Sequence, residues 1–170
     1  MNIKRILPIA ALPLLILSAC TQLPTDPYTG SYTFKTSGTV TVVVSADVSD
    51  KDAVKLEPKV YDLTTEFGRM DIKARGNDTM LVTMNVLGGD VYVFDAELTP
   101  GGFRLLPSTR TLRVGTLPDF QVTVSGEAFI LDGLLNVNLV YSGSRPVLPS
   151  INYTITDCNV VCVAQKKNRG

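Results

Sequence analysis

Apolar and polar residues alternate between Phe120 and Tyr141 with the period of a half-buried β-strand. Asp132-Gly133 divides this stretch, and both residues tolerate the positive φ angles of a two-residue hairpin turn. Such a turn places the apolar residues of both arms on one face, and a slip by one residue would expose them all. The predicted pairs are Ile130 with Leu135, Ala128 with Val137, and Val124 with Tyr141.

The same alternation recurs along residues 31–165 and predicts ten or eleven short strands, with no convincing amphipathic helix. Turns are expected at 36–38, 76–78, 88–90 and 99–102, where glycine, proline, asparagine or serine interrupt the apolar runs. The pairs that these turns predict are Phe34–Val40, Tyr32–Val42, Ala74–Met80, Ile72–Val82, Met70–Met84, Met84–Phe94, Val86–Tyr92, Met80–Leu98, Leu98–Phe103 and Ala96–Leu105.

Several segments have a less regular pattern. Residues 49–53 and 142–149 are expected to be loops, and residues 57–69 support no firm assignment. Pro107 is expected to end a strand, which resumes at 109–114 with Leu112 and Val114 facing inward. The apolar phase changes near Asp157, where we expect a bulge or turn.

Consecutive hairpins whose apolar side chains all lie on one face of the sheet predict an all-β protein. The expected fold is an antiparallel meander that closes into a barrel. A two-layer β-sandwich is the alternative. The length of 170 residues favours a single domain, placed at 31–165, followed by a polar tail at 166–170.

The first nineteen residues have the features of a signal peptide, with Lys4 and Arg5 preceding an apolar run that is too short to span a membrane. The run ends in Leu17-Ser18-Ala19-Cys20, which resembles the lipobox of bacterial lipoproteins. This resemblance implies cleavage before Cys20, acylation of its sulfur and amine, and attachment to a membrane. The alternative is an ordinary secreted protein with a cysteine near the cleavage site.

The residues after Cys20 predict a subcellular localisation. Thr21 stands where an aspartate would favour inner-membrane retention in lipoproteins, and no acidic cluster follows it. By this resemblance, we expect the bacterial outer membrane and its periplasmic face. Residues 20–30, with two prolines, are expected to form a flexible, extended tether.

The composition limits the chemistry. Sixteen Lys and Arg balance sixteen Asp and Glu, which favours no nucleic-acid partner. The chain has no His, which removes Ser-His and Cys-His nucleophiles, most catalytic zinc sites and the usual near-neutral general base. We therefore expect no enzymatic activity, no cofactor and no metal site.

Residues 79–143 resemble the repeating hairpins of bacterial calycin-like, or lipocalin-like, lipoproteins. The resemblance rests on the segments T-M-L-V-T-M, D-F-Q-V-T-V-S-G-E-A and D-G-L-L-N-V-N-L, the last followed by Tyr141-Ser142-Gly143. The chain lacks the Gly-X-Trp motif of classical lipocalins, since it has no Trp. The resemblance implies a barrel whose interior could hold a small apolar molecule, without assigned chemistry.

Methionine and aromatic side chains gather on the expected inner face and could line an adaptable pocket. The alternative is an interior filled by its own side chains. The candidate lining residues are Tyr32, Phe34, Met70, Met80, Met84, Tyr92, Phe94 and Tyr141.

Two other groups of residues could carry chemistry. Cys158 and Cys162 could form a disulfide if a turn brought them together, but on a straight strand they would lie about 13 Å apart and remain thiols. A glycosidase-like carboxylate pair is conceivable, although all but one of the acidic candidates fall on the expected solvent face and the last lies in a turn. These candidates are Asp71, Asp95, Glu97, Glu127 and Asp132.

The sequence therefore supports two functional hypotheses. The first is a lipid-anchored envelope barrel that binds a small hydrophobic ligand or lipid. The second is a structural or interaction lipoprotein with a filled core, which offers a strand edge or loops to another envelope protein.

Overall fold

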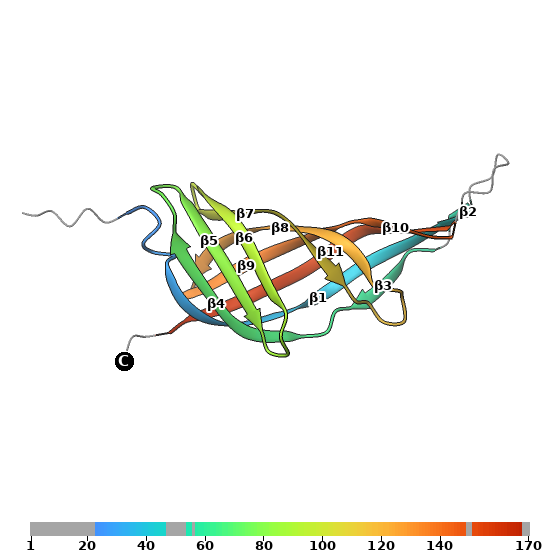
Figure 1. The fold of residues 1–170 in the computed structure, drawn as a ribbon, viewed down its shortest axis with the longest axis horizontal. Coiled ribbons are helices and arrows are strands. Elements are labelled where there is room, and N and C mark those ends of the chain that lie inside the picture. The colour runs from blue at the N-terminus through green and yellow to red at the C-terminus, as the bar shows by residue number, and fades with distance from the viewer. Residues whose placement is uncertain (1–22, 47–53, 56, 149–150, 168–170) are drawn as a thin grey trace, which may run out of the picture.

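The computed structural model describes residues 23–46, 54–55, 57–148 and 151–167, and within these ranges the protein is all-β (Figure 1). No helix among them is long and apolar enough to cross a membrane. The strands are β1 (Gly30–Ala46), β2 (Val54–Lys55), β3 (Lys59–Asp62), β4 (Glu66–Ala74), β5 (Thr79–Val86), β6 (Val91–Thr99), β7 (Gly102–Leu112), β8 (Phe120–Leu131), β9 (Leu134–Ser142), β10 (Ser144–Leu148) and β11 (Ile151–Lys166).

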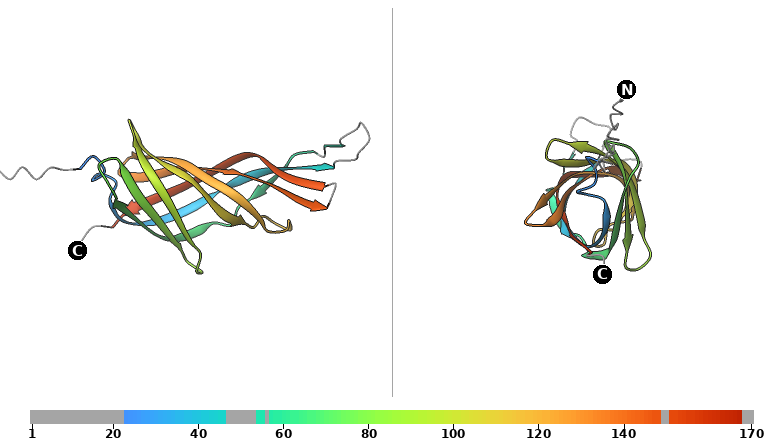
Figure 2. Two further views of the ribbon diagram at one scale, coloured as in Figure 1. Left: turned by 45° about the horizontal axis from the view of Figure 1, so that its top comes forward. Right: turned by 90° about the vertical axis from the view of Figure 1, so that its left-hand side faces the viewer.

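Eight strands form a closed antiparallel barrel. Strands β4 to β9 are neighbours in chain order, β11 follows β9, and β1 lies beside β4. The pairing of β11 with β1 closes the ring, which Figure 2 shows end-on in its right-hand view. The predicted meander and barrel are confirmed, and the two-layer sandwich is excluded.

Most predicted hairpins have the expected register. Val124 pairs with Tyr141 and Ile130 with Leu135, around a turn in which Asp132 and Gly133 have φ of 52° and 76°. The turns at 76–78 and 99–102 also produce the predicted pairs. Short turns between alternating strands therefore carried enough local information to set the pairing.

The turn between β5 and β6 differs by one position from the prediction. The expected loop was 88–90, but Met84 pairs with Tyr92 and Val82 with Phe94. The Val86 N–H donates to the Asp90 carbonyl at 2.8 Å, so that residues 87–89 form the loop. Gly88 and Gly89 both adopt positive φ, 119° and 114°, which glycine accommodates without steric cost. Because the whole loop is shifted by one residue, each residue of β5 pairs with the β6 residue two positions before the predicted one. Every side chain therefore stays on its predicted face of the sheet.

The predicted turn at 36–38 is wrong. β1 continues through these residues and pairs along its length with β11, including Thr36 with Cys162 and Gly38 with Val160. A Cβ on Gly38 would lie 2.1 Å from the Asn159 carbonyl oxygen. The glycine therefore permits a close backbone approach inside a long strand, which has the same local signature as a turn.

Long strands continue beyond the ring. β2 and β3 pair with β1, and β10 pairs with β11, so that a narrow ribbon extends from one end of the barrel, on the right in Figure 1. The loop predicted for 142–149 is therefore wrong over Ser144–Leu148. Pro146 is accommodated because β10 is short and irregular at that point. The predicted loop at 49–53 lies outside the described residues.

Two irregularities shape the barrel strands. Pro107 does not end β7: the register shifts between Leu105 and Ser108, and the strand continues. The predicted irregularity near Asp157 is confirmed, since Thr41 pairs with Asp157 whereas Val42 pairs with Ile155. Each shift changes which side chains face inward.

The barrel has two unlike ends. The closed end carries the turns at 75–78, 99–102 and 131–134, and residues 23–29 lie against it. The open end carries the turn at 87–89, the segment 63–65 and the segment 113–119. Figure 2 shows the N-terminal segment at the closed end.

The expected tether is largely a docked turn. The Tyr28 N–H donates to the Thr25 carbonyl at 3.0 Å, and Thr25 is fully buried. The Tyr28 ring meets the Phe103 ring edge-on, with 5.3 Å between the centroids. The Tyr32 hydroxyl donates to the Tyr28 carbonyl at 2.6 Å. Residues 23–29 are therefore held against the barrel, whereas Cys20 lies outside the described residues.

Most of the interior is filled by apolar side chains from alternating positions. Val122, Val124 and Val137 are buried as predicted. Ile130 is an exception, since it was expected to face inward and is 46% exposed. It is the second-to-last residue of its hairpin arm, where the strand passes beyond the packed core.

Candidate functional site

A pocket of about 620 Å³ lies at the open end of the barrel. Its lining comes from the segment 63–65, the 87–89 turn and parts of β1, β4, β5, β6, β7, β8 and β9. β6 pairs with β7 only from Ala96–Leu105 to Thr99–Gly102. Beyond that stretch the two strands separate, and the pocket lies where the wall is split.

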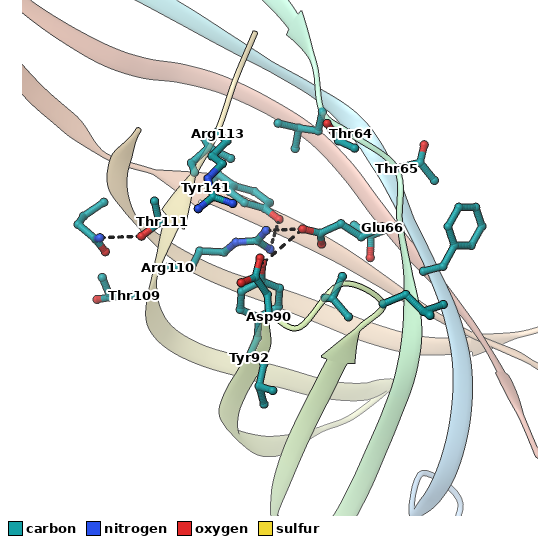
Figure 3. Close-up of a pocket in the computed structure, with 18 residues that line it drawn as sticks. Thr64, Thr65, Glu66, Asp90, Tyr92, Thr109, Arg110, Thr111, Arg113 and Tyr141 are labelled. Atoms are coloured by element: carbon teal, nitrogen blue, oxygen red, sulfur yellow. Dashed lines mark hydrogen bonds and ion pairs between the residues drawn. The ribbon is translucent and has the colours of Figure 1, made fainter. Parts of the chain in front are cut away.

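Four side chains at this pocket, Arg110, Glu66, Tyr92 and Tyr141, form what we call the Arg110 site (Figure 3). The irregularity at Pro107 places Arg110 there. Before it, the odd residues Phe103 and Leu105 face inward, whereas after it Arg110 faces inward beside Val122. A bulge thus directs a charged side chain into the barrel.

The other three positions follow from strand alternation. Glu66 shares its face of β4 with the buried Met70 and Ile72. Tyr92 pairs with the buried Met84. The side chain of Tyr141 is itself buried on β9.

The arginine connects the other three side chains. Arg110 Nη2 donates to Glu66 Oε1 at 2.8 Å, and Arg110 Nη1 donates to the Tyr141 hydroxyl at 2.9 Å. Its guanidinium carbon lies 3.9 Å from the centre of the Tyr92 ring, within the range of a cation–π contact. The side chains of Arg110 and Glu66 are only 11% and 20% exposed. The site is a largely desolvated ion pair framed by two aromatic rings.

Two polar atoms at the pocket have unused hydrogen-bonding capacity. Within the described part of the chain, three buried side-chain atoms lack a partner, namely Thr25 Oγ1, Thr36 Oγ1 and Arg110 Nε. Thr36 and Arg110 both line the pocket. Buried polar groups are normally paired, so water or a bound molecule in the pocket would supply partners for these two atoms.

Both tyrosines are neutral hydrogen-bonding groups. Burial raises the pKa of Tyr92 to about 12 and raises the pKa of Tyr141 further. The Tyr92 hydroxyl lies 3.4 Å from Glu66 Oε1 and 3.4 Å from Asp90 Oδ2. At neutral pH these hydroxyls can donate to carboxylates or accept from a bound molecule, but they do not supply phenolate nucleophiles.

The remaining lining is mostly polar. Arg113 and Asp90 add one positive and one negative charge. Together with Arg110 and Glu66, the pocket lining therefore has two charges of each sign. Hydroxyl and amide groups complete the polar surface, from Thr36, Thr64, Thr65, Thr109, Thr111 and Gln121. No group of three or more Cys, Asp or Glu side chains in the described ranges is arranged to hold a metal ion.

Only Tyr92 and Tyr141 of the eight predicted lining residues reach the pocket. The other six are at most 4% exposed and belong to the packed core. Over most of the barrel, then, the filled-interior alternative describes the structure. The six are Tyr32, Phe34, Met70, Met80, Met84 and Phe94.

The proposed disulfide is not formed. Cys158 and Cys162 lie on the same strand, paired with Val40 and Thr36, and both thiols are free. The irregularity lies before Cys158, so it does not shorten the distance between the two cysteines. Burial raises the pKa of Cys162 to about 11, which keeps this thiol protonated.

Three of the acidic candidates lie on the outer surface in ion pairs. Asp71 pairs with Arg69, Asp95 with Arg75 and Glu97 with Arg104. Glu127 and Asp132 are exposed. The carboxylates at the pocket are Glu66 and Asp90, which the sequence analysis did not single out. Glu66 is even-numbered like the inward-facing Met70 and Ile72, and Arg110 is even-numbered like Leu112 and Val114. The alternation of the sequence therefore already indicated that both side chains face inward.

Comparison with protein-family models and with curated protein sequences finds no match to this chain.

Proposed function

We propose that this protein is a non-enzymatic, lipid-anchored lipoprotein of the bacterial envelope whose barrel binds a small molecule at the Arg110 site. The observation that carries the proposal is a desolvated Arg110–Glu66 pair in a pocket of about 620 Å³, inside an otherwise apolar barrel. That volume falls within the range of small-molecule sites.

The ion pair is better explained by recognition than by stability. Desolvating two charges costs free energy, and well-packed apolar residues often replace a buried pair without loss. Elsewhere the interior of this barrel uses apolar residues, so the fold itself does not require the pair. A fixed guanidinium with an aromatic face on one side provides directional contacts for a ligand.

The lining supports a polar ligand more strongly than the apolar molecule expected from sequence. Arg110 and Arg113 balance Glu66 and Asp90, and threonine hydroxyls supply both donors and acceptors. These features favour an uncharged or zwitterionic molecule with several hydrogen-bonding groups. The pocket also has an apolar surface, which comes from Leu63, Phe67, Val86, Leu87, Val91 and Leu112.

The proposed anchor and localisation rest on the lipobox resemblance around Cys20. Acylation of Cys20 would hold the protein on the outer membrane, on its periplasmic face. Replacing Cys20 with Ala should release the protein from the membrane fraction into the soluble fraction. Unchanged membrane association would refute the anchor.

Native mass spectrometry of protein purified from its own envelope tests the binding site. We expect a retained small molecule that is released on denaturation. Arg110→Leu alone would leave the buried Glu66 carboxylate without its partner. The informative variant is therefore Arg110→Met with Glu66→Leu, which removes both charges together. This double variant should fold and lose the molecule.

Arg104→Leu is the matched control. Arg104 lies on the same strand and pairs with Glu97 at 3.0 Å, but on the exposed outer surface. This variant should retain the molecule. Equal retention by the control and the double variant would place binding elsewhere.

The interaction hypothesis is the second candidate, because β6 and β7 separate at the open end. The part of β6 that does not pair with β7 carries exposed Val91 and Val93. Ser108 Oγ donates to the Val93 carbonyl at 3.1 Å, and the rest of this edge can accept an added strand. Repeated purification without a retained small molecule would favour this role.

A further inference from the structure

The closed end of the barrel lies within a short reach of Cys20. Leu23 begins the docked segment and is only three residues after the cysteine. Three fully extended residues span about 10 Å at most. Lys166 Nζ also donates to the Pro27 carbonyl at 3.3 Å, which further holds the segment in place. The closed end, where this segment docks, must therefore lie near any membrane to which Cys20 is attached.

The closed end also presents exposed apolar side chains. Ile130 and Leu131 are 46% and 56% exposed, immediately before the Asp132-Gly133 turn. Consecutive strand residues point to opposite faces, so both faces of this hairpin tip are apolar and accessible to solvent. Adjacent exposed large apolar residues at the end of a strand differ from the outer wall of β4 to β7, which carries the exposed ion pairs Arg75–Asp95 and Arg104–Glu97.

We propose that the β8–β9 hairpin tip, with Ile130 and Leu131, contacts the lipid surface and seats the barrel on its closed end. This inference rests on the lipid anchor of the proposed function. It provides a second membrane contact, which complements acyl chains in stable attachment. It also directs the Arg110 site away from the bilayer, so that the ligand enters from the aqueous phase and is not extracted from lipid.

Single-tryptophan variants test this orientation because the chain contains no Trp. Leu131→Trp places the reporter at the hairpin tip. Leu87→Trp is the matched control, since Leu87 is 79% exposed in a turn at the open end. Both full-length proteins would be purified with their lipid and reconstituted in phosphatidylethanolamine–phosphatidylglycerol vesicles, with and without brominated acyl chains.

We expect Trp emission of the Leu131→Trp protein to shift to shorter wavelength and to be quenched severalfold by brominated lipid. Emission of the Leu87→Trp protein should stay at the wavelength of a water-exposed indole and change little. Circular dichroism of both variants would check that the barrel is intact.

Failure of the proposed orientation and failure of the lipid anchor give different results. If both proteins sediment with the vesicles but their emission is equally insensitive to brominated lipid, the orientation is refuted while the anchor stands. If neither sediments with the vesicles, the anchor is refuted and the orientation with it. Quenching of the Leu87→Trp protein alone would show the opposite orientation.

Discussion

The two ends of this barrel use the same strands for different purposes. At the closed end, the interior is apolar and a docked segment covers it, with Tyr28 against Phe103. At the open end, the wall splits between β6 and β7, and a charged pair lies inside. The comparison shows how a barrel can concentrate stability in one part and leave another available for binding.

The difference begins with hydrogen bonding in the wall. Around the closed end, short turns hold neighbouring strands in continuous register. At the open end, Pro107 lies in a register irregularity, and only a few β6–β7 pairs remain. The irregularity lies in the β7–β8 pairing and turns Arg110 inward, next to the place where the β6–β7 pairing ends.

The largest expected effect is at the closed end. Phe103→Ala removes a fully buried ring from the core and from its contact with Tyr28. We expect the free energy of unfolding to fall by about 3–5 kcal/mol. Urea unfolding followed by far-ultraviolet circular dichroism measures it.

Phe67→Ala is the matched control at the open end, where Phe67 is 50% exposed. Its loss should lower the free energy of unfolding by less than about 1 kcal/mol. Equal losses in the two variants would contradict a difference in packing between the ends.

The Arg110 site should show the next largest effect. Arg110→Leu leaves the carboxylate of Glu66 without its partner, and we expect a loss of about 2 kcal/mol in the free energy of unfolding. Arg110→Met with Glu66→Leu should restore stability to within about 1 kcal/mol of the wild type. A double-mutant cycle measured by urea unfolding gives the coupling directly.

The exposed pair of Arg104 and Glu97 supplies the reference for that cycle. Its side chains are 56% and 46% exposed, so solvent screens the interaction. Arg104→Leu should change the free energy of unfolding by less than about 0.5 kcal/mol. If the outer pair contributed as much as the inner one, the distinction between a desolvated site and a solvated wall would fail.

The smallest effect concerns pH at the boundary between the two regions. Cys162 faces Thr36, and burial raises its pKa from 9.0 to about 11. The folded state therefore keeps a proton that the unfolded chain releases. The corresponding stability is present below pH 9 and is lost as pH rises towards 11. We expect a loss of about 1 kcal/mol between pH 9 and 10.

Urea unfolding at these two pH values, compared with Cys162→Ala, isolates the contribution of this thiol. The buried tyrosines have ordinary pKa values of 10.0 and contribute mainly at higher pH. An identical pH dependence in the variant would rule out Cys162 as its source.

Local signals determined much of the fold. Alternation set the inner face of most strands, and short turns with Gly, Asp or Pro set the pairing at 75–78, 99–102 and 132–133. The phase change before Cys158 correctly located a bulge. These features were accessible because each depends on residues that are close together in the chain.

Only the tertiary structure decided the rest. Whether Gly38 turns the chain or lies within a long strand depends on β11, more than a hundred residues away. Whether Pro107 ends a strand or forms a bulge depends on β8, and that outcome directs Arg110 towards Glu66. The amino-acid sequence by itself determined which side chains alternate. Closure of the ring decided which of them meet, because contacts between distant strands are set by the pairing of the whole sheet.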